Sequence, residues 1–324
     1  MKPLDGRLVV DFTRLLPGAF ASRELLRLGA RVVRVEPPAG DAMRNLAPAW
    51  HDALNAGKES VVCDLKSDRA LAEALLARAD VVLEGFRPEV ADRLGVGAAH
   101  APTSTVYCSI TGFGAGDLRA GHDLNYLGWA GVLADTAPAV PPVQVADLAA
   151  GALGAVVEIL AALLAGGGAR LTISMTHRSH RFASHRLDGD PAPRLLTGGV
   201  ACYRIYATAD GRWLTVAALE EKFWRRLCEL VELSELVDRR FESELPELEA
   251  RLASRTLAHW LDLFEGEDVC TGPVASLDEA ARDFGDRPPA AHAPQLGEHT
   301  EAWLRELRGG DGDGAAEAAR EMHD

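Results

Sequence analysis

Paired cysteines are the first thing that this chain of 324 residues lacks. Its five cysteines, at positions 63, 108, 202, 228 and 270, are scattered, and none belongs to a close C-x-x-C pair. Such spacing argues against a disulfide framework or a zinc site and predicts a reducing compartment. An apolar leader is also missing, because Met-Lys-Pro-Leu-Asp-Gly leads directly into an expected strand. We therefore expect a cytoplasmic protein.

Positive charge and long apolar runs are scarce as well. The chain has 34 Lys and Arg against 48 Asp and Glu, which gives a net charge of −14. A nucleic-acid-binding protein would present a basic face, so this balance argues against one, and an anionic ligand would need a local basic patch. The one long apolar run, Leu148–Ala165, is rich in Ala and Gly and carries Glu158 in its middle. We expect it to be a core helix and not a membrane span.

Glycine-rich phosphate motifs are the third absence. The first strand-to-helix turn runs Arg14-Leu-Leu-Pro17-Gly18, with one glycine, whereas a pyrophosphate cradle needs several. The chain has no G-x-x-x-x-G-K-[ST] loop and no G-x-S-x-G nucleophile elbow. These absences argue against nicotinamide chemistry, a P-loop enzyme and a serine hydrolase.

What the chain does have is a regular alternation of strands and helices. Apolar runs predict strands at 8–12, 31–36, 60–65, 80–86, 104–111 and 171–175, with helices such as 18–29 and 67–78 between them. This order predicts an α/β fold with a Rossmann-like, mainly parallel sheet.

After this region the pattern changes. The polar stretch 177–194 predicts a linker, and 203–217 predicts a hairpin around Ala-Asp-Gly. Helical spacing at 221–233 and 248–264 then completes a smaller α+β domain.

Ligands of parallel sheets bind beyond the carboxyl ends of the strands. Four cations lie near loops on this expected binding edge, with Lys58 in the loop that enters the third strand. They are Arg34, Arg44, Lys58 and Arg87. Together they could form the basic patch that a phosphorylated ligand requires. Any one of them could equally be a solvated surface residue.

His122 and Asp147 each come just before a long apolar stretch. At the starts of two buried helices they could act as a proton-transferring pair on either side of one carbon atom. The alternative is structural: a loop histidine and an aspartate that caps the first helical turn.

Seven segments give the chain a resemblance to a known family. They are LDGRLVVDF (4–12), LGARVVRVEPP (28–38), LNAGKESVVCDLK (54–66), ADVVLEGFRP (79–88), SITGFG (109–114), ADGRW (209–213) and LGEHT (296–300). In these segments the chain resembles the family III CoA-transferase (CaiB/BaiF-type) group, which includes α-methylacyl-CoA racemase. The stretch Gly121-His122-Asp-Leu-Asn-Tyr126 is most similar to the racemase branch.

The resemblance implies an organisation and a set of site residues. It implies a large CoA-binding α/β domain at 1–185, a small α+β domain at 186–285, and a C-terminal segment at 286–324 that returns to the large domain, with a frayed tail from Gly309. Family members are interlocked homodimers, so the same is expected here. By the same resemblance, His122 and Asp147 are the acid/base groups and Glu220 orients His122. Substrate contacts are implied for four residues: Arg34, Lys58 and Arg87 at CoA, and Tyr126 near the thioester.

The reaction that these residues suggest is racemisation of the α-carbon of a 2-methyl-branched acyl-CoA through an enolate. It needs two groups of different pKa and no cofactor beyond the CoA of the substrate. Backbone N–H groups at the helix start near Asp147 could hold the enolate oxygen.

A CoA-transferase would use Asp147 differently, as a nucleophile that forms an acyl anhydride. A non-catalytic acyl-CoA binder is the third possibility. The segments 123–146 and 176–198 are shorter than is usual in the family, which bears on the acyl group accepted.

Overall fold

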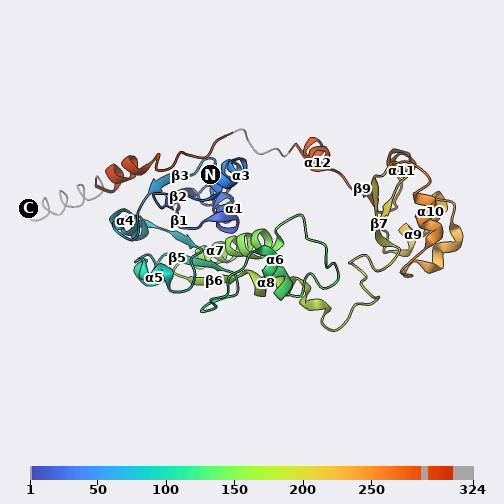
Figure 1. Ribbon diagram of the computed structural model, residues 1–324, viewed down its shortest axis with the longest axis horizontal. Helices are drawn as coiled ribbons and strands as arrows, with labels where there is room; N and C mark the ends of the chain where they lie inside the picture. Colours follow the sequence, from blue (N-terminus) through green and yellow to red (C-terminus); the bar gives the residue numbers. More distant parts are fainter. Residues whose placement is uncertain (1, 286–290, 309–324) are drawn as a thin grey trace, which may run out of the picture. The chain divides into compact units, whose positions relative to one another are not determined.

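The computed structural model describes residues 2–285 and 291–308. Its first unit is built on a six-stranded sheet in the order β3-β2-β1-β4-β5-β6, in which all neighbouring strands are parallel (Figure 1). The strands are β1 (Leu8–Asp11), β2 (Arg31–Glu36), β3 (Glu59–Val62), β4 (Val81–Glu84), β5 (Val106–Thr111) and β6 (Arg170–Ser174). The predicted α/β class and Rossmann-like parallel sheet are confirmed.

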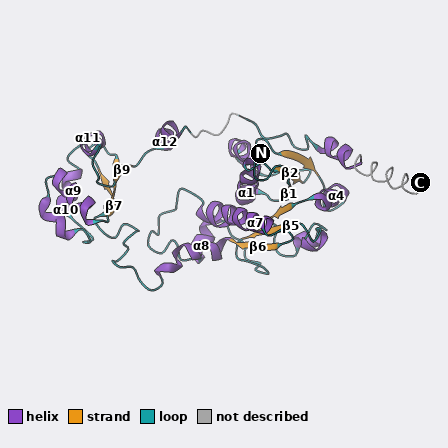
Figure 2. Cartoon of the chain, turned by 180° about the vertical axis from the view of Figure 1, so that it is seen from behind, coloured by secondary structure: helices purple, strands orange, loops and turns teal. Residues whose placement is uncertain are grey.

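Helices cover both faces of this sheet. They are α1 (Leu15–Arg27), α2 (Met43–Leu46), α3 (Pro48–Asn55), α4 (Ala70–Arg78), α5 (Val90–Arg93), α6 (Asp123–Trp129), the π-helix η2 (Ala146–Leu153), α7 (Gly154–Leu164) and α8 (Met175–Ala183), with a 3-10 turn η1 (Ala98–His100). Successive strand residues point to opposite faces. Val9 and Val32 therefore pack with α1, η2 and α7, whereas Val10 and Val33 pack with α4 (Figure 2).

The order of the strands reverses between β1 and β4, which places a crevice at their carboxyl ends. The start of α1 lies very close to the end of β1. A Cβ atom on Gly18 would lie 2.0 Å from Thr13 Oγ1, so only glycine fits there. Leu15, the first residue of α1, has φ of 64°, a left-handed conformation that costs energy for a branched side chain. The chain thus turns sharply into the crevice.

The apolar run predicted as a core helix forms η2 and α7. By length and composition alone, Ala146–Leu164 is the one helix of the described residues that could cross a membrane. Here it packs on the sheet, with Ala146, Ala155 and Ile159 fully buried in the core. One detail of the prediction was wrong. Asp147 is the second residue of η2 and makes no side-chain cap, because the helical turn begins earlier in the chain.

The predicted linker at 177–194 was also partly wrong. Its first third continues α8, whose start is capped by the Ser174 hydroxyl accepting a hydrogen bond from the His177 N–H at 3.3 Å. Met175, Thr176 and Ser179 are buried against neighbouring helices. Polar composition hid this helix, because packing of one face and an N-cap stabilise it more than propensity does.

The second unit, whose described residues are 135–137 and 185–285, is an α+β structure with its own apolar core. Its antiparallel sheet has the order β7-β8-β9, and β7 and β8 form the predicted hairpin. The elements are β7 (Tyr203–Ala207), β8 (Trp213–Ala217), α9 (Glu221–Leu230), a 3-10 helix η4 (Ser234–Arg239), α10 (Pro246–Leu252), α11 (Leu257–Phe264), β9 (Thr271–Pro273) and α12 (Leu277–Phe284). A further 3-10 turn, η3 (Ser184–Arg186), connects the units.

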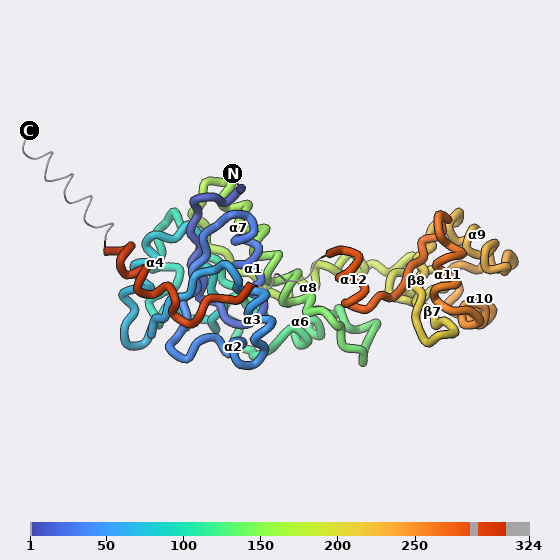
Figure 3. The backbone as a smooth tube through the Cα atoms, turned by 90° about the horizontal axis from the view of Figure 1, so that it is seen from above, coloured from blue at the N-terminus to red at the C-terminus, as the bar shows by residue number. Residues whose placement is uncertain are grey.

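The C-terminal segment belongs to the first unit. Its described part, 291–308, runs beside β3 and ends in a helical stretch, 300–308 (Figure 3, red). The Val62 N–H donates to Thr300 Oγ1 at 3.0 Å, and the Trp303 indole donates to Glu59 at 2.5 Å. The tail that we predicted to be frayed from Gly309 lies outside the described residues.

Candidate active site

A cavity of about 710 Å³ opens at the carboxyl ends of β1, β4 and β5. Its walls come from the loops that follow these strands, from the start of α1, and from α6 and η2. Four of the predicted site residues line it: Arg87, His122, Tyr126 and Asp147. The first unit therefore brings together residues that lie up to 60 positions apart in the sequence.

His122 stands at the N-cap position of α6, with an extended backbone conformation (φ −131°, ψ 177°). Its backbone N–H donates to Asn125 Oδ1 at 3.1 Å, which fixes the first turn of the helix. The imidazole itself is exposed and lies on the cavity wall. A substrate in the cavity can therefore reach it.

Asp147 faces the same cavity from η2. Burial raises the pKa of its carboxyl to about 7, and the negative charge of Asp123 adds to the effect. A carboxyl with this pKa can give or take a proton near neutral pH. The Asp147 backbone N–H donates to Asp123 Oδ1 at 3.0 Å. This amide is therefore engaged, and the oxyanion role expected of N–H groups at this helix start stays a prediction.

Tyr126 forms the floor of the cavity beside His122. Its hydroxyl donates to the Gly121 carbonyl, and its ring meets Phe113 edge-on with centroids 5.3 Å apart. A Cβ on Gly112 would come within 2.5 Å of this ring, so the floor needs a glycine there. Burial, followed by the charges of nearby carboxylates, raises the pKa of Tyr126. The phenol therefore stays neutral and holds the loop that carries His122.

Arg87 is the predicted cation that reaches this cavity. It is exposed, and its guanidinium has no ion pair or hydrogen bond with any residue in 2–285 or 291–308. Arg14, at the N-cap of α1, also lines the cavity and is exposed. Both are available to an anionic ligand.

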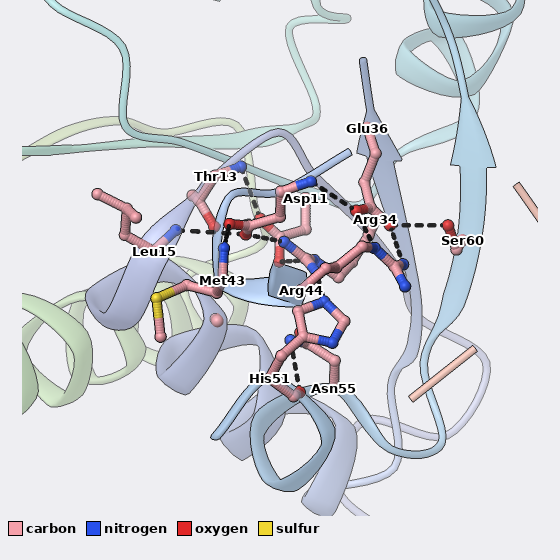
Figure 4. Close-up of polar contacts among 12 residues, drawn as sticks. Asp11, Thr13, Leu15, Arg34, Glu36, Met43, Arg44, His51, Asn55 and Ser60 are labelled. Carbon is pink, nitrogen blue, oxygen red and sulfur yellow. Dashed lines mark hydrogen bonds and ion pairs between the residues drawn. The ribbon is translucent and has the colours of Figure 1, made fainter. Parts of the chain in front are cut away.

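Arg34 and Lys58 lie elsewhere, in a buried polar network between β1, β2, α1 and α3. Figure 4 shows the part of this network around Arg34. Arg34 is 1% exposed, donates to Asp41 Oδ2 at 2.7 Å and contacts His51 Nε2 at 3.1 Å. Asp41 in turn accepts from the Met43 N–H at 2.9 Å and, at 3.4 Å, from the N–H of Leu15. Met43 and Leu15 line the cavity, so this network ends at its wall.

Lys58 is enclosed more completely. Its three ammonium protons have three acceptors, namely the Ala19 carbonyl at 2.8 Å, Ser22 Oγ at 2.7 Å and Asn55 Oδ1 at 2.9 Å. Burial lowers the pKa of Lys58 to about 7. A contact of Lys58 or Arg34 with CoA stays a prediction.

Arg44 completes the predicted basic patch, and it too is paired. It forms two hydrogen bonds with Glu36, at 2.9 and 2.6 Å. Burial would raise the pKa of Glu36, but Arg44, with help from Arg34 and Ser60, lowers it to about 2. The Glu36 carboxylate thus holds Arg44 in place.

Glu220 belongs to the second unit, where it is the exposed N-cap residue of α9. Its predicted contact with His122 stays a prediction. The residue that sequence reasoning missed is Asp123. Its signal was present, because an acid in the first turn of a helix, directly after a candidate catalytic histidine, is placed to bind backbone N–H groups or to tune a neighbour.

The comparisons with known proteins identify the family of the chain. The model of "CoA-transferase family III" matches residues 4–300. The human α-methylacyl-CoA racemase is 32% identical over 94% of this chain and 93% of its own length. The mouse succinyl-CoA:glutarate CoA-transferase is 33% identical over 86% of this chain and 73% of its own length.

Solved structures with a similar fold point to the same family. The crystal structure of a hypothetical protein from Mycobacterium tuberculosis superposes with a TM-score of 0.79 at 28% identity, and it covers 93% of this chain and 99% of its own. A CAIB/BAIF family protein from Brucella suis superposes with a TM-score of 0.78 at 26% identity, with 94% and 99% covered. The resemblance read from the sequence is confirmed. The chain belongs to CoA-transferase family III, whose members include racemases and CoA-transferases.

Proposed function

We propose that the protein is a racemase or epimerase that acts on the α-carbon of a 2-methyl-branched acyl-CoA. The observation that carries this proposal is the cavity shared by the imidazole of His122 and the carboxyl of Asp147, whose pKa of about 7 lets it give or take a proton near neutral pH. Relatives named α-methylacyl-CoA racemase support it.

The proposed reaction uses these two groups in turn. The neutral imidazole of His122 takes the α-proton, and the electron pair of the C–H bond moves into the thioester to form an enolate. The protonated carboxyl of Asp147 then gives its proton to the α-carbon from the opposite face. The reverse reaction starts with Asp147 ionised and His122 protonated. A carboxyl pKa of about 7 suits both directions, because each form is populated.

The remaining residues bind and position the thioester. Arg87, at the cavity wall, is proposed to contact the phosphates of CoA. Tyr126 is proposed to lie beside the thioester. Neither a metal ion nor a redox cofactor is required by this chemistry, so dialysis against a chelator is expected to leave the activity unchanged.

A deuterium-exchange experiment tests the proposal. The protein is incubated with an enantiopure 2-methylacyl-CoA in deuterated water, and α-deuterium and loss of optical purity are followed together. Equal rates of exchange and racemisation, both lost in His122→Ala, are expected. An absence of exchange in the wild-type protein would reject the proposal.

A CoA-transferase is the second candidate, because relatives at 31–33% identity are named as CoA-transferases. Asp147 would then attack the thioester carbonyl and expel CoA as a thiolate, leaving an acyl anhydride. This role requires an ionised carboxylate, which a pKa of about 7 disfavours below neutral pH. Hydroxylamine trapping of an acyl group on Asp147, without α-exchange, would establish this alternative. CoA-ester binding without either reaction would leave a non-catalytic binder.

We also propose a homodimer in which Glu220 of one subunit orients His122 of the other. A complementation experiment tests this arrangement. His122→Ala and Glu220→Ala subunits, each inactive alone, are unfolded and refolded together. Recovery of about a quarter of the activity is expected if the site is shared, since some mixed dimers then hold one intact site. No recovery, although mixed dimers form, would place Glu220 and His122 in one chain or in separate roles. We propose a cytoplasmic location for the protein as well.

A further inference from the structure

One side chain connects the first turns of the two helices that carry His122 and Asp147. Asp123 is the first residue of α6, directly after His122. Its Oδ1 atom accepts the hydrogen bond from the backbone N–H of Asp147, the second residue of η2, at 3.0 Å. Asp123 does not line the cavity, so it is placed to act on Asp147 and not on a substrate.

The bond satisfies a group that needs a partner. The first N–H groups of any helix have no acceptor within the helix. Val145, at the N-cap of η2, makes no side-chain cap. Asp123 therefore supplies the missing acceptor from a different helix, and in doing so it sets the distance between the two helix starts.

The charge of Asp123 also acts on Asp147. A helix start favours a negative charge, which by itself would help Asp147 to ionise. Because the Asp123 carboxylate is bonded to that helix start, a second negative charge there is opposed. Other charged or titratable groups lie on the elements that pack against η2. They are His122 and Tyr126 on α6, Arg14, Arg23, Glu24 and Arg27 on or beside α1, Glu158 on α7, His177, Arg178, His180 and Arg181 on α8, Tyr107 and Cys108 on β5, and Arg170 on β6. The charge of Asp123 adds to the effect of burial in raising the pKa of the Asp147 carboxyl.

We propose that Asp123 is a positioning residue: its side chain holds the start of η2 beside His122 and places a second carboxylate at the helix start that carries Asp147. The inference rests on the proposed function for its catalytic meaning, since a protonated Asp147 is the group that returns a proton to the enolate. The geometry and charge are independent of which reaction follows.

Two variants separate the two effects. Asp123→Asn keeps an Oδ1 acceptor for the Asp147 N–H but removes the charge. Asp123→Ala removes both. Asp68→Asn is the matched control, because Asp68 likewise accepts from a helix-start amide, the Ala70 N–H at 3.2 Å, but lies at α4, outside the cavity lining.

The first readout is an infrared titration of carboxyl groups in the full chain, in which Asp147 is identified by the band that Asp147→Asn removes. In Asp123→Asn the midpoint of this band is expected to fall by about one pH unit, and in Asp68→Asn it stays unchanged. The second readout is the pH profile of α-proton exchange, whose upper limb is expected to shift down equally in Asp123→Asn. Asp123→Ala is expected to lose exchange further, because the helix start is no longer held.

An unchanged Asp147 midpoint in Asp123→Asn would overturn the inference, whatever the activity. If the wild-type protein shows no α-exchange but the midpoint still shifts, the proposed racemase fails and the role of Asp123 stands. If exchange is present and neither readout moves in Asp123→Asn, the racemase stands and Asp123 is merely a structural acceptor.

Discussion

Two groups of ionisable residues in the first unit differ in how their charges are satisfied. Lys58 has three acceptors within 3 Å, and the Arg34 guanidinium is bonded to Asp41 at 2.7 Å; both cations are buried. At the other group, no cation within 2–285 or 291–308 is bonded to the half-buried Asp147 carboxyl, and the His122 imidazole is exposed to the cavity. The difference teaches that buried cations bonded to acceptors within the protein stabilise the fold. A carboxyl that has a raised pKa and faces a cavity instead indicates a catalytic role.

The sharpest way to break this comparison is to remove His122. We expect His122→Ala to lower the rate of α-deuterium exchange by about 10³-fold, because one general acid/base group is lost. Stability to urea is expected to stay within about 0.5 kcal/mol, since the imidazole is exposed. His100→Ala, another exposed histidine in the first unit, is the control and keeps full activity. A loss of less than tenfold would remove His122 from the mechanism.

For Arg34 we expect the opposite result, a loss of stability and not of catalysis. Arg34→Met leaves the buried Asp41 and Asp11 carboxylates without their cation, which costs about 3 kcal/mol of unfolding free energy in urea titrations. Arg31→Met, on the same strand but with a half-exposed side chain, is expected to cost about 1 kcal/mol or less. A stable Arg34→Met protein with a strongly raised KM for the CoA ester would contradict a purely structural role and restore the predicted CoA contact.

Substitution of Arg87 tests whether this exposed cation at the cavity binds the acyl-CoA. Arg87→Ala is expected to raise KM for the acyl-CoA about tenfold and to leave kcat within about twofold, because a charge-assisted contact to phosphate is lost. The effect is expected to shrink at high salt. Arg7→Ala, at the opposite edge of the sheet, serves as the control. An unchanged KM would exclude Arg87 from binding CoA.

The pH dependence of stability gives the smallest effect, and its sign differs between the two groups. Folding raises the pKa of Asp147 to about 7, so the folded state binds its proton more tightly and stability falls as pH rises from about 4 to about 7. Folding lowers the pKa of Glu36 to about 2, so its contribution is present above pH 4.5 and is lost as pH falls toward 2.

Asp147→Asn should therefore raise the unfolding free energy at pH 8 by about 1 kcal/mol after allowance for solvent screening, and change little at pH 4. Urea titrations at several pH values measure this difference. Parallel curves for the wild-type and variant proteins would show that folding leaves the Asp147 pKa unperturbed.

Much of the first unit could be predicted from local patterns. Valine-rich runs with helices between them gave the parallel sheet, because strands buried on both faces are apolar throughout. The hairpin at 203–217 followed from two alternating runs around Ala-Asp-Gly. The start of α8 could not be predicted this way, since its polar sequence is helical only through packing against its neighbours.

The sequence by itself determined which chemistry-bearing side chains stand at the ends of strands and the starts of helices, because local periodicity and turn residues set those ends. It also carried the family, through motifs spread along the chain. Only the tertiary structure decided which of these side chains meet a cavity and which meet each other. Arg34 and Lys58 find their partners in Asp41, Asn55, Ser22 and Ala19, whereas Asp147 finds a second carboxylate in Asp123. The physical reason is that burial and neighbouring charge come from residues distant in the sequence, and these fix whether a charge is satisfied or left reactive.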